Sequence, residues 1–411
     1  TTIEQYKFIK ANVIETIDQN LINLEFIVEE GDKFYVDRIN IFGNTVTAES
    51  VIRNQLLLDE GDPFSDILVN KSVNNIKSLN FFKKVNSKIS FNDNNMTKSI
   101  DIFVEEKPTG EIYASAGAGT SGASFGFGVK ENNFLGNGIG LDSNFFVSTS
   151  EFKGKFSVTN PNFNNSDKSI YFSAQATEND NYKTFGYKTN KTGFSVGTNF
   201  EYLNDFYLGL NNSNFYETIE TNSTASAQQQ QQEGNYWDLF IIFDMNYYKR
   251  NQKFQTSSGF KSFYSLNLPV VSDTNTIKNY YNYSKYFSFF EKNFSSLSLY
   301  LQSANSINNK NIKLSERITI PSSRLRGFQY GRIGPKDGDD FIGGNYAYSL
   351  NFASNLPAIF EESQNLDFLI FADVADIWGV DYNSSIKGDG IRSSIGAALD
   401  WLTPVGPINF T

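Results

Sequence analysis

The protein has 411 residues, with 35 Lys and Arg against 45 Asp and Glu, and it contains neither His nor Cys. Without these two residue types it cannot form a Ser-His-Asp triad, a disulfide, or a His- or Cys-ligated metal site. The net charge of −10 argues against a nucleic-acid partner, because phosphate backbones are bound by an excess of Lys and Arg. We therefore expect no metal, no cofactor and no nucleic acid.

Aromatic residues are unusually frequent, at 16% of the chain. No apolar run is long enough for a transmembrane helix, which excludes a helical membrane protein. Two classes remain: a large soluble protein with an aromatic core, and an outer-membrane β-barrel, in which aromatic girdles and alternating strands replace long apolar runs.

The first hundred residues follow a mixed α/β pattern. A strand is predicted at 22–28, and from residue 34 onward the order strand, helix, helix, strand, strand is predicted. The expected elements are a strand at 34–42, a helix capped by Thr47, a second helix capped by Ser65 or Asp66, and strands at 82–90 and 98–104.

From Gly110 onward helical periodicity disappears and apolar residues alternate with polar ones. Ile112, Ala114 and Ala116 share one face of a strand, while Glu111 and Tyr113 share the other. The alternation continues to the end of the chain, with Lys, Asp and Gln opposite Phe, Ile and Val. A lipid-facing exterior and a polar lumen produce this pattern, so we favour a transmembrane barrel over a soluble β protein.

The predicted connections differ in length. Ser148 to Ser150 forms a tight turn, whereas 211–235 reads as a long polar loop, and we expect its glutamine run at 228–232 to be a disordered tip. Short turns at one rim and long loops at the other are typical of outer-membrane barrels.

Residues 318–345 hold the most specific motifs, which are Leu325-Arg326-Gly327-Phe328, then Gly334-Pro335, then Gly343-Gly344-Asn345. This stretch resembles the inward-folded loop of the BamA family of outer-membrane assembly proteins. Four further segments resemble the family in the same order: 34–44, 133–138, 159–163 and 402–407. Five matches in order make the resemblance specific.

The resemblance implies a fold class and three domains. Residues 1–33 would end a preceding POTRA domain, 34–107 would form the last α+β POTRA domain, and 108–411 would form an all-β transmembrane antiparallel barrel. The family barrel has sixteen strands. We expect the closing strand, like the upstream POTRA domains, to lie outside this sequence.

The resemblance also implies the partners of the loop arginine. Arg326 would dock inside the barrel on Asp373, while Asn351 stands where the family usually has Glu and would give the arginine a neutral hydrogen bond. Asp376 follows Asp373 by three positions on a predicted strand, so the two carboxylates face opposite sides and are not expected to form a catalytic pair.

The function implied is non-enzymatic: folding and insertion of outer-membrane proteins by β-augmentation at a lateral gate. The partners implied are unfolded outer-membrane β-barrel clients, the lipid bilayer, and accessory outer-membrane lipoproteins at the POTRA domain. The location implied is the outer membrane of a Gram-negative bacterium, with the POTRA domain in the periplasm. The gate strand would comprise Glu111, Ile112, Tyr113, Ala114, Ser115, Ala116, Gly117 and Ala118.

A two-partner-type polypeptide secretion pore of the same superfamily is the alternative. An outer-membrane protease or lipase is disfavoured by the absence of His. A general porin is disfavoured because porins carry no POTRA domain.

Overall fold

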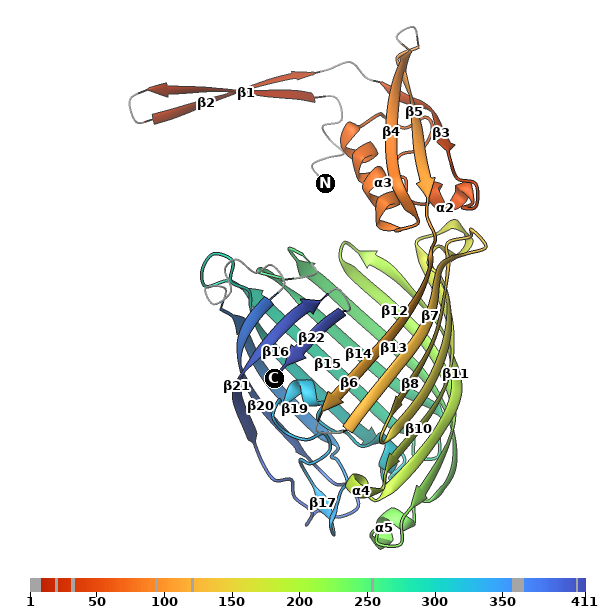
Figure 1. The fold of residues 1–411 in the computed structure, drawn as a ribbon, viewed down its shortest axis with the longest axis vertical. Helices are drawn as coiled ribbons and strands as arrows, with labels where there is room; N and C mark the ends of the chain where they lie inside the picture. Colours follow the sequence, from red (N-terminus) through yellow and green to blue (C-terminus); the bar gives the residue numbers. More distant parts are fainter. Residues whose placement is uncertain are drawn as a thin grey trace. The chain divides into compact units, whose positions relative to one another are not determined.

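The computed structural model describes residues 9–18, 21–30, 34–92, 95–119, 122–252, 255–356, 366–403 and 406–411. The chain forms two compact units (Figure 1). The first comprises residues 1–111, 130–140 and 164–166, and the second comprises 112–129, 141–163 and 167–411. Of the 402–407 motif, residues 404 and 405 lie outside the described residues.

The first unit begins with an antiparallel hairpin of β1 (Ile9–Asp18) and β2 (Leu21–Glu30), paired from Ile9 with Glu30 to Asp18 with Leu21. The predicted strand–helix–helix–strand–strand order after it is confirmed. The elements are β3 (Tyr35–Phe42), α2 (Glu49–Arg53), α3 (Asp66–Ser78), β4 (Phe82–Asn92) and β5 (Thr97–Glu106).

The three strands of this α/β part form one sheet in the order β3-β5-β4, with β3 parallel to β5 and β4 antiparallel to it. Apolar side chains of both helices and of the sheet form a shared core, in which Ile52, Ile76 and Ile102 are fully buried. Strand β4 is therefore an edge strand, with one side unpaired within this sheet.

The two helices begin differently. Ser65 caps α3, as predicted, because its side chain accepts from the Leu68 N–H. The prediction of Thr47 as the first cap was wrong: Ala48 occupies that position without a side-chain bond. The Thr47 N–H instead donates to Glu106 Oε1 at 2.6 Å, and its hydroxyl accepts from the Asn133 amide at 2.9 Å. Thr47 is therefore bound to the Glu106 carboxylate and the Asn133 amide, both distant in the sequence, and its side chain does not cap α2.

The second unit is built on a large antiparallel sheet in which every strand pairs with its neighbours along the chain, curved as Figure 1 shows. Its 15 strands are β6 (Gly110–Gly119), β7 (Gly122–Phe134), β8 (Ile139–Ser148), β9 (Glu151–Asn160), β10 (Lys168–Asn181), β11 (Tyr187–Leu203), β12 (Phe206–Thr221), β13 (Gly234–Arg250), β14 (Gly259–Val271), β15 (Thr276–Phe287), β16 (Ser295–Ser306), β19 (Tyr346–Asn355), β20 (Leu366–Trp378), β21 (Arg392–Thr403) and β22 (Gly406–Phe410). The sheet order starts at β6 and ends at β22.

The two faces of the sheet differ as the alternation predicts. Phe125, Phe145 and Ile370 are among the exposed large apolar side chains. On the other face Ser349 and Asp373 are buried. One face is therefore apolar and open, and the other carries polar groups covered by other parts of the chain.

The prediction about the connections was wrong in two respects. Strands β6, β8 and β12 run in the same direction. The tight turn at 149–150 and the connection at 222–233 therefore lie at the same rim of the sheet, the rim at which β6 ends. The glutamine run is also folded. It forms α5 (Ala227–Gln230), and Gln229 is 0% exposed with its amide donating to the Phe185 carbonyl at 2.8 Å.

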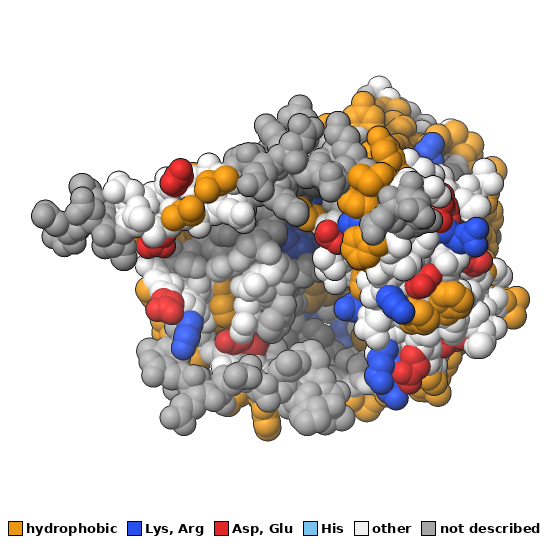
Figure 2. Space-filling model, turned by 90° about the horizontal axis from the view of Figure 1, so that it is seen from above, with side chains coloured by type: hydrophobic (Ala, Val, Ile, Leu, Met, Phe, Trp, Pro, Cys, Tyr) orange, Lys and Arg blue, Asp and Glu red, His pale blue; other side chains and the backbone are white. Residues whose placement is uncertain are grey.

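The face of the molecule seen in Figure 2 carries basic and acidic side chains interspersed among hydrophobic ones. Among the residues drawn in colour, no broad patch of a single sign is visible on this face. The electrostatic potential above this face is therefore not dominated by one sign of charge.

Candidate functional site: a segment fastened to the inner face of the sheet

The long connection between β16 and β19, residues 307–345, is called the inner segment here. It contains two 3-10 turns, η2 (Leu314–Glu316) and η3 (Ser322–Arg324), and a small hairpin of β17 (Lys336–Asp337) and β18 (Asp340–Phe341). Its apolar residues form one buried cluster with strands β16, β19 and β20. The cluster comprises Tyr300, Ala304, Ile312, Ile318, Ile320, Leu325, Ile333, Ala347, Ala375 and Ile377.

The motif at 325–328 lies within this packing. Leu325 is buried in the cluster, and Phe328 packs against its edge. Gly327 adopts φ +85°, a backbone conformation that other residues rarely adopt. The turn at Gly327 allows the chain to pass directly from the buried Leu325 to the more open stretch that follows.

Arg326 forms the central ion pair of the site. Its Nε lies 2.8 Å from Oδ2 of Asp373 and its Nη2 lies 2.7 Å from Oδ1, while its backbone N–H donates to Oδ2 at 3.0 Å. The guanidinium also lies over the Phe371 ring, 3.7 Å from the centroid. Arg is suited to this position because its planar fork matches a carboxylate and its face stacks on a ring.

Asn351 differs from the expectation that it would hydrogen-bond to the arginine. Its amide donates instead to Asp373 Oδ1 at 2.9 Å and to the Arg324 carbonyl at 2.7 Å. The reason is the strand register. Asn351 lies directly opposite Asp373 in the β19–β20 pair, so its amide is within hydrogen-bonding distance of the carboxylate. Asn351 thus orients Asp373 and holds the backbone before Arg326.

The other predicted motif residues lie in the second half of the inner segment. Gly334 packs against Ile377 of β20, and the Pro335 carbonyl accepts from the Ile342 N–H at 3.1 Å. Gly344 exchanges two backbone hydrogen bonds with Ile318, at 2.8 and 2.9 Å. These bonds close the inner segment on itself just before β19 begins.

The predicted gate residues form most of β6. Ile112 is 76% exposed, on the same face as Ala114, Ala116 and Ala118. On the opposite face, the Tyr113 hydroxyl donates to Asp142 at 3.3 Å. Glu111 accepts from the Asn132 amide at 3.3 Å. The structure does not bring β6 and the Arg326 pair together in any hydrogen bond among the described residues.

Sequence reasoning missed a second group of charged residues on the inner segment. Lys313 binds Glu217 of β12 and Asp238 of β13, and Arg317 binds Asp381. Arg324 donates to Asn282 of β15 at 2.9 Å. The lysine stands in a polar stretch that reads as a surface loop. The one sequence signal for a buried cation was the pair Glu217 and Asp238, two carboxylates on neighbouring strands for which the sequence analysis had assigned no partner.

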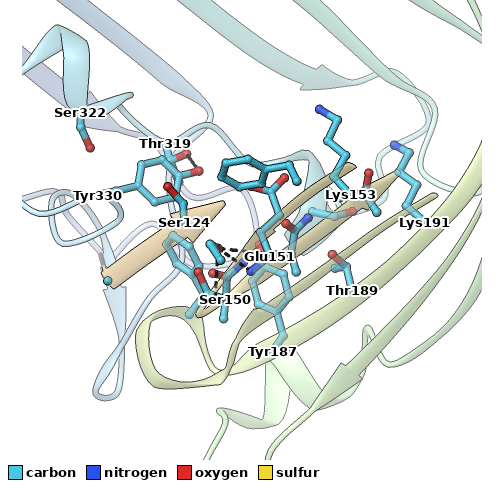
Figure 3. A pocket seen from close by; sticks show the side chains of 18 of the residues that line it. Ser124, Ser150, Glu151, Lys153, Tyr187, Thr189, Lys191, Thr319, Ser322 and Tyr330 are labelled. Carbon is cyan, nitrogen blue, oxygen red and sulfur yellow. Dashed lines mark hydrogen bonds between the residues drawn. The ribbon is translucent and has the colours of Figure 1, made fainter. Parts of the chain in front are cut away.

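A cavity of about 940 Å³ lies between the inner segment and the first half of the sheet. Figure 3 shows Lys153 and Lys191 extending side by side from their strands. Thr319 and Tyr330 of the inner segment hydrogen-bond to each other at 2.9 Å. Lys153 and Lys191 both register with Thr177 of β10, so they form one cross-strand row. The interior next to the inner segment is therefore polar and roomy.

No helix among the described residues is both long and apolar enough to cross a bilayer. No group of three or more acidic, His or Cys residues among them is arranged to hold a metal ion.

Comparison with known proteins identifies the family. The profile of the Omp85 superfamily domain matches residues 133–411, and the POTRA profile, described as a surface antigen variable number repeat, matches residues 34–107. The chain belongs to the Omp85 superfamily.

Several Omp85 relatives are named outer membrane protein assembly factor BamA. The protein from Neorickettsia risticii is 25% identical over 94% of this chain and 53% of its own length. The protein from Neisseria meningitidis serogroup B is 22% identical over 99% of this chain and 57% of its own length. The chain spans about half the length of these relatives.

Solved structures agree on the Omp85 fold. BamA from Haemophilus ducreyi lacking POTRA domains 1–3 aligns with a TM-score of 0.76 at 22% identity, over 99% of this chain and 86% of that one. CdiB from Acinetobacter baumannii aligns with a TM-score of 0.56 at 11% identity, over 97% of this chain and 73% of that one.

Proposed function

We propose that this chain is the central barrel subunit of an outer-membrane β-barrel assembly machine, which folds and inserts client barrels without enzymatic chemistry. The observation that carries the proposal is a long antiparallel sheet whose first strand is β6, in a chain whose inner segment is fixed by Arg326 and Asp373. The relatives named as assembly factors support the same assignment.

The physical need for such a subunit lies in the edges of an incomplete barrel. Each unpaired backbone group costs several kcal/mol in hydrocarbon, so a client strand needs a partner while it enters the membrane. A strand at the end of a sheet supplies that partner by β-augmentation. The client's own folding provides the free energy, and no nucleotide or metal is needed.

The composition of β6 suits a temporary partner. Four of its residues are Ala or Gly in the stretch Ala116 to Gly119. Small side chains give a strand little to lock its register, so pairing with it is weakly specified and reversible. We infer that residues 111–118 form the lateral gate, at which a client strand is received and then released.

The α/β part would act outside the bilayer. We propose that it lies in the periplasm as a POTRA domain, and that the hairpin at 9–30 belongs to a preceding POTRA domain. Strand β4 is an edge strand with one side free within its sheet. That edge is the proposed site for handing over unfolded clients or for docking accessory outer-membrane lipoproteins.

The test uses the whole chain in liposomes, with an unfolded outer-membrane barrel as the client and the folded fraction followed over time. We expect the wild-type chain to speed client folding and Arg326→Ala to slow it. Arg332→Ala is the matched control, because Arg332 is an exposed arginine of the same segment, whose side chain donates to the Lys183 carbonyl and lies over the Phe341 ring. Client folding no faster than in empty liposomes, together with passage of an extended polypeptide, would favour the secretion pore.

A further inference from the structure

The first end of the inner segment holds a buried lysine between two carboxylates. Lys313 is 1% exposed, and its Nζ lies 2.9 Å from Glu217 of β12 and also binds Asp238 of β13. The two carboxylates are 2% and 1% exposed. They lie on the same face of adjacent strands, since Glu217 registers with Tyr236 and Asp238 follows two residues later. A single ammonium group therefore bridges two carboxylates that belong to two strands.

The residues after Lys313 are bound just as closely. The Leu314 N–H donates to the side chain of Gln232, and the Leu314 carbonyl accepts from the Tyr187 hydroxyl. Ser315 donates to Glu217 at 2.8 Å. This turn is thus attached to β11, to β12 and to the folded connection that precedes β13.

Glu316 completes the attachment on the other side. It accepts from the hydroxyls of Thr276 and Thr274 at 2.7 and 2.9 Å, and it lies 3.4 Å from the Lys278 ammonium. Thr276 and Lys278 belong to β15. Residues 313–316 therefore bind β11, β12 and β13 on one side and β15 on the other.

The Arg326 end of the segment uses a different set of partners. Asp373 and Phe371 belong to β20 and Asn351 to β19. In the described part of the chain, none of them shares a hydrogen bond or an ion pair with the Lys313 group. The Arg326 side chain is 21% exposed. Withdrawing Arg326 leaves one carboxylate that keeps its Asn351 bond, whereas withdrawing Lys313 removes the one cation that binds both buried carboxylates. Unpaired buried charge is the costlier outcome.

We propose that Lys313 is a positioning residue that anchors the first end of the inner segment to β12 and β13 independently of Arg326, so that the Arg326 end is the one that detaches first. The inner segment then works as an arm with a fixed base and a releasable tip. Its part in client folding rests on the function proposed above, but the anchoring itself does not.

The absence of Cys from the sequence allows a direct test, because any introduced cysteine is unique. Asn311 and Ser323 are exposed and lie two and three residues before Lys313 and Arg326. A nitroxide label at either position reports the mobility of that end by electron paramagnetic resonance. We expect Lys313→Met to mobilise the label at 311 and leave 323 unchanged, and Arg326→Ala to do the reverse.

Lys310→Met is the matched control, because Lys310 is exposed on the same stretch, and it should change neither label. If either Lys313→Met or Arg326→Ala mobilises both ends together, the two anchors are one unit and the proposal is wrong. It is equally wrong if Lys313→Met leaves the label at 311 unchanged. Should Lys313→Met not fold, a variant with Glu217→Gln and Asp238→Asn added removes all three charges together. In that variant, mobility at 311 alone supports the anchor, and an immobile 311 overturns it.

Client folding separates this inference from the proposed function. Independent anchors predict that the fold-changes in client folding rate for Lys313→Met and Arg326→Ala multiply in the double variant. If the wild-type chain does not speed client folding at all, the proposed function fails, while the label mobilities still decide whether Lys313 is an anchor.

Discussion

Arg326 binds Asp373 through three donors, its backbone N–H, Nε and Nη2, at 3.0, 2.8 and 2.7 Å. Asp373 is 0% exposed and also receives the Asn351 amide. This arrangement depends on a planar fork and not on charge alone. We therefore expect Arg326→Lys to keep the fold but to recover only part of the client folding rate that Arg326→Ala loses. Equal rates for Arg326→Lys and the wild-type chain in the liposome assay would show that a point charge is enough.

The ring beneath the arginine depends on a glycine of the next strand. An added Cβ at Gly396 would lie 2.5 Å from Cζ of Phe371, so the ring under Arg326 would have to move. We expect Gly396→Ala to cost about 1–3 kcal/mol, the usual cost of overpacking, and to lower the temperature at which the folded band is lost in heat-modifiability gels.

Gly154→Ala is the control for that substitution, since a Cβ there meets Phe145 at 3.5 Å, an ordinary contact. A label at 323 should become mobile in Gly396→Ala and stay fixed in Gly154→Ala. An unchanged gel transition for Gly396→Ala would mean that Phe371 finds another position without loss.

The α/β part should respond to acid through Glu106. Burial alone would raise the pKa of Glu106, but hydrogen bonds from Thr45, Val46 and Thr47 lower it to about 2. The folded pKa is thus below the ordinary value of 4.5. The stabilisation is present above pH 4.5 and is lost as the pH falls toward 2.

Amide hydrogen exchange on the whole chain measures this effect. We expect the protection of the Thr45 to Thr47 amides to fall between pH 4.5 and pH 2 in the wild-type chain. In Glu106→Gln the protection should be lower and independent of pH over that range. Glu105→Gln, which changes the neighbouring exposed carboxylate, should behave like the wild type. Protection in Glu106→Gln that follows the wild-type curve would assign the effect to another group.

The connection at 222–233 should depend on Gln229 and not on the neighbouring Gln228. The buried amide of Gln229 satisfies the Phe185 carbonyl, so Gln229→Ala leaves that group unpaired, at a cost of about 1–3 kcal/mol. We expect faster proteolytic cleavage within 222–233 for Gln229→Ala, and wild-type cleavage for Gln228→Ala, whose side chain is exposed. Equal cleavage of the two variants would contradict a specific role for Gln229.

Much of the fold could be predicted because the signals were local. Period-two alternation fixed the faces of the strands, and the cap at Ser65 expresses the conformational preference of one residue. The order of elements from 34 to 107 followed from such signals. The motif at 325–328 was informative about the family because it requires an apolar residue, an arginine, a glycine and a second apolar residue in consecutive positions.

What could not be predicted depends on partners far apart in the sequence. Thr47 is not a cap because Glu106 and Asn133 reach it first, and the glutamine run is folded because Phe185 offers a carbonyl. Lys313 was not singled out from the sequence because its carboxylates stand on two other strands. Such contacts depend on the register and direction of the strands, which cannot be derived from local sequence patterns.

The most direct test of the account is whether a client strand pairs with β6. A single cysteine at Ser115 of β6 would be combined with single cysteines along the edge strand of a client, and disulfide formation followed while the client folds in liposomes. A cysteine at Ser265 of β14 is the control, because β14 is paired on both sides. The account predicts cross-links from 115 that appear before the client is folded and disappear afterward, with none from 265. Client folding that is accelerated without any cross-link from 115, or with equal cross-links from 265, would contradict it.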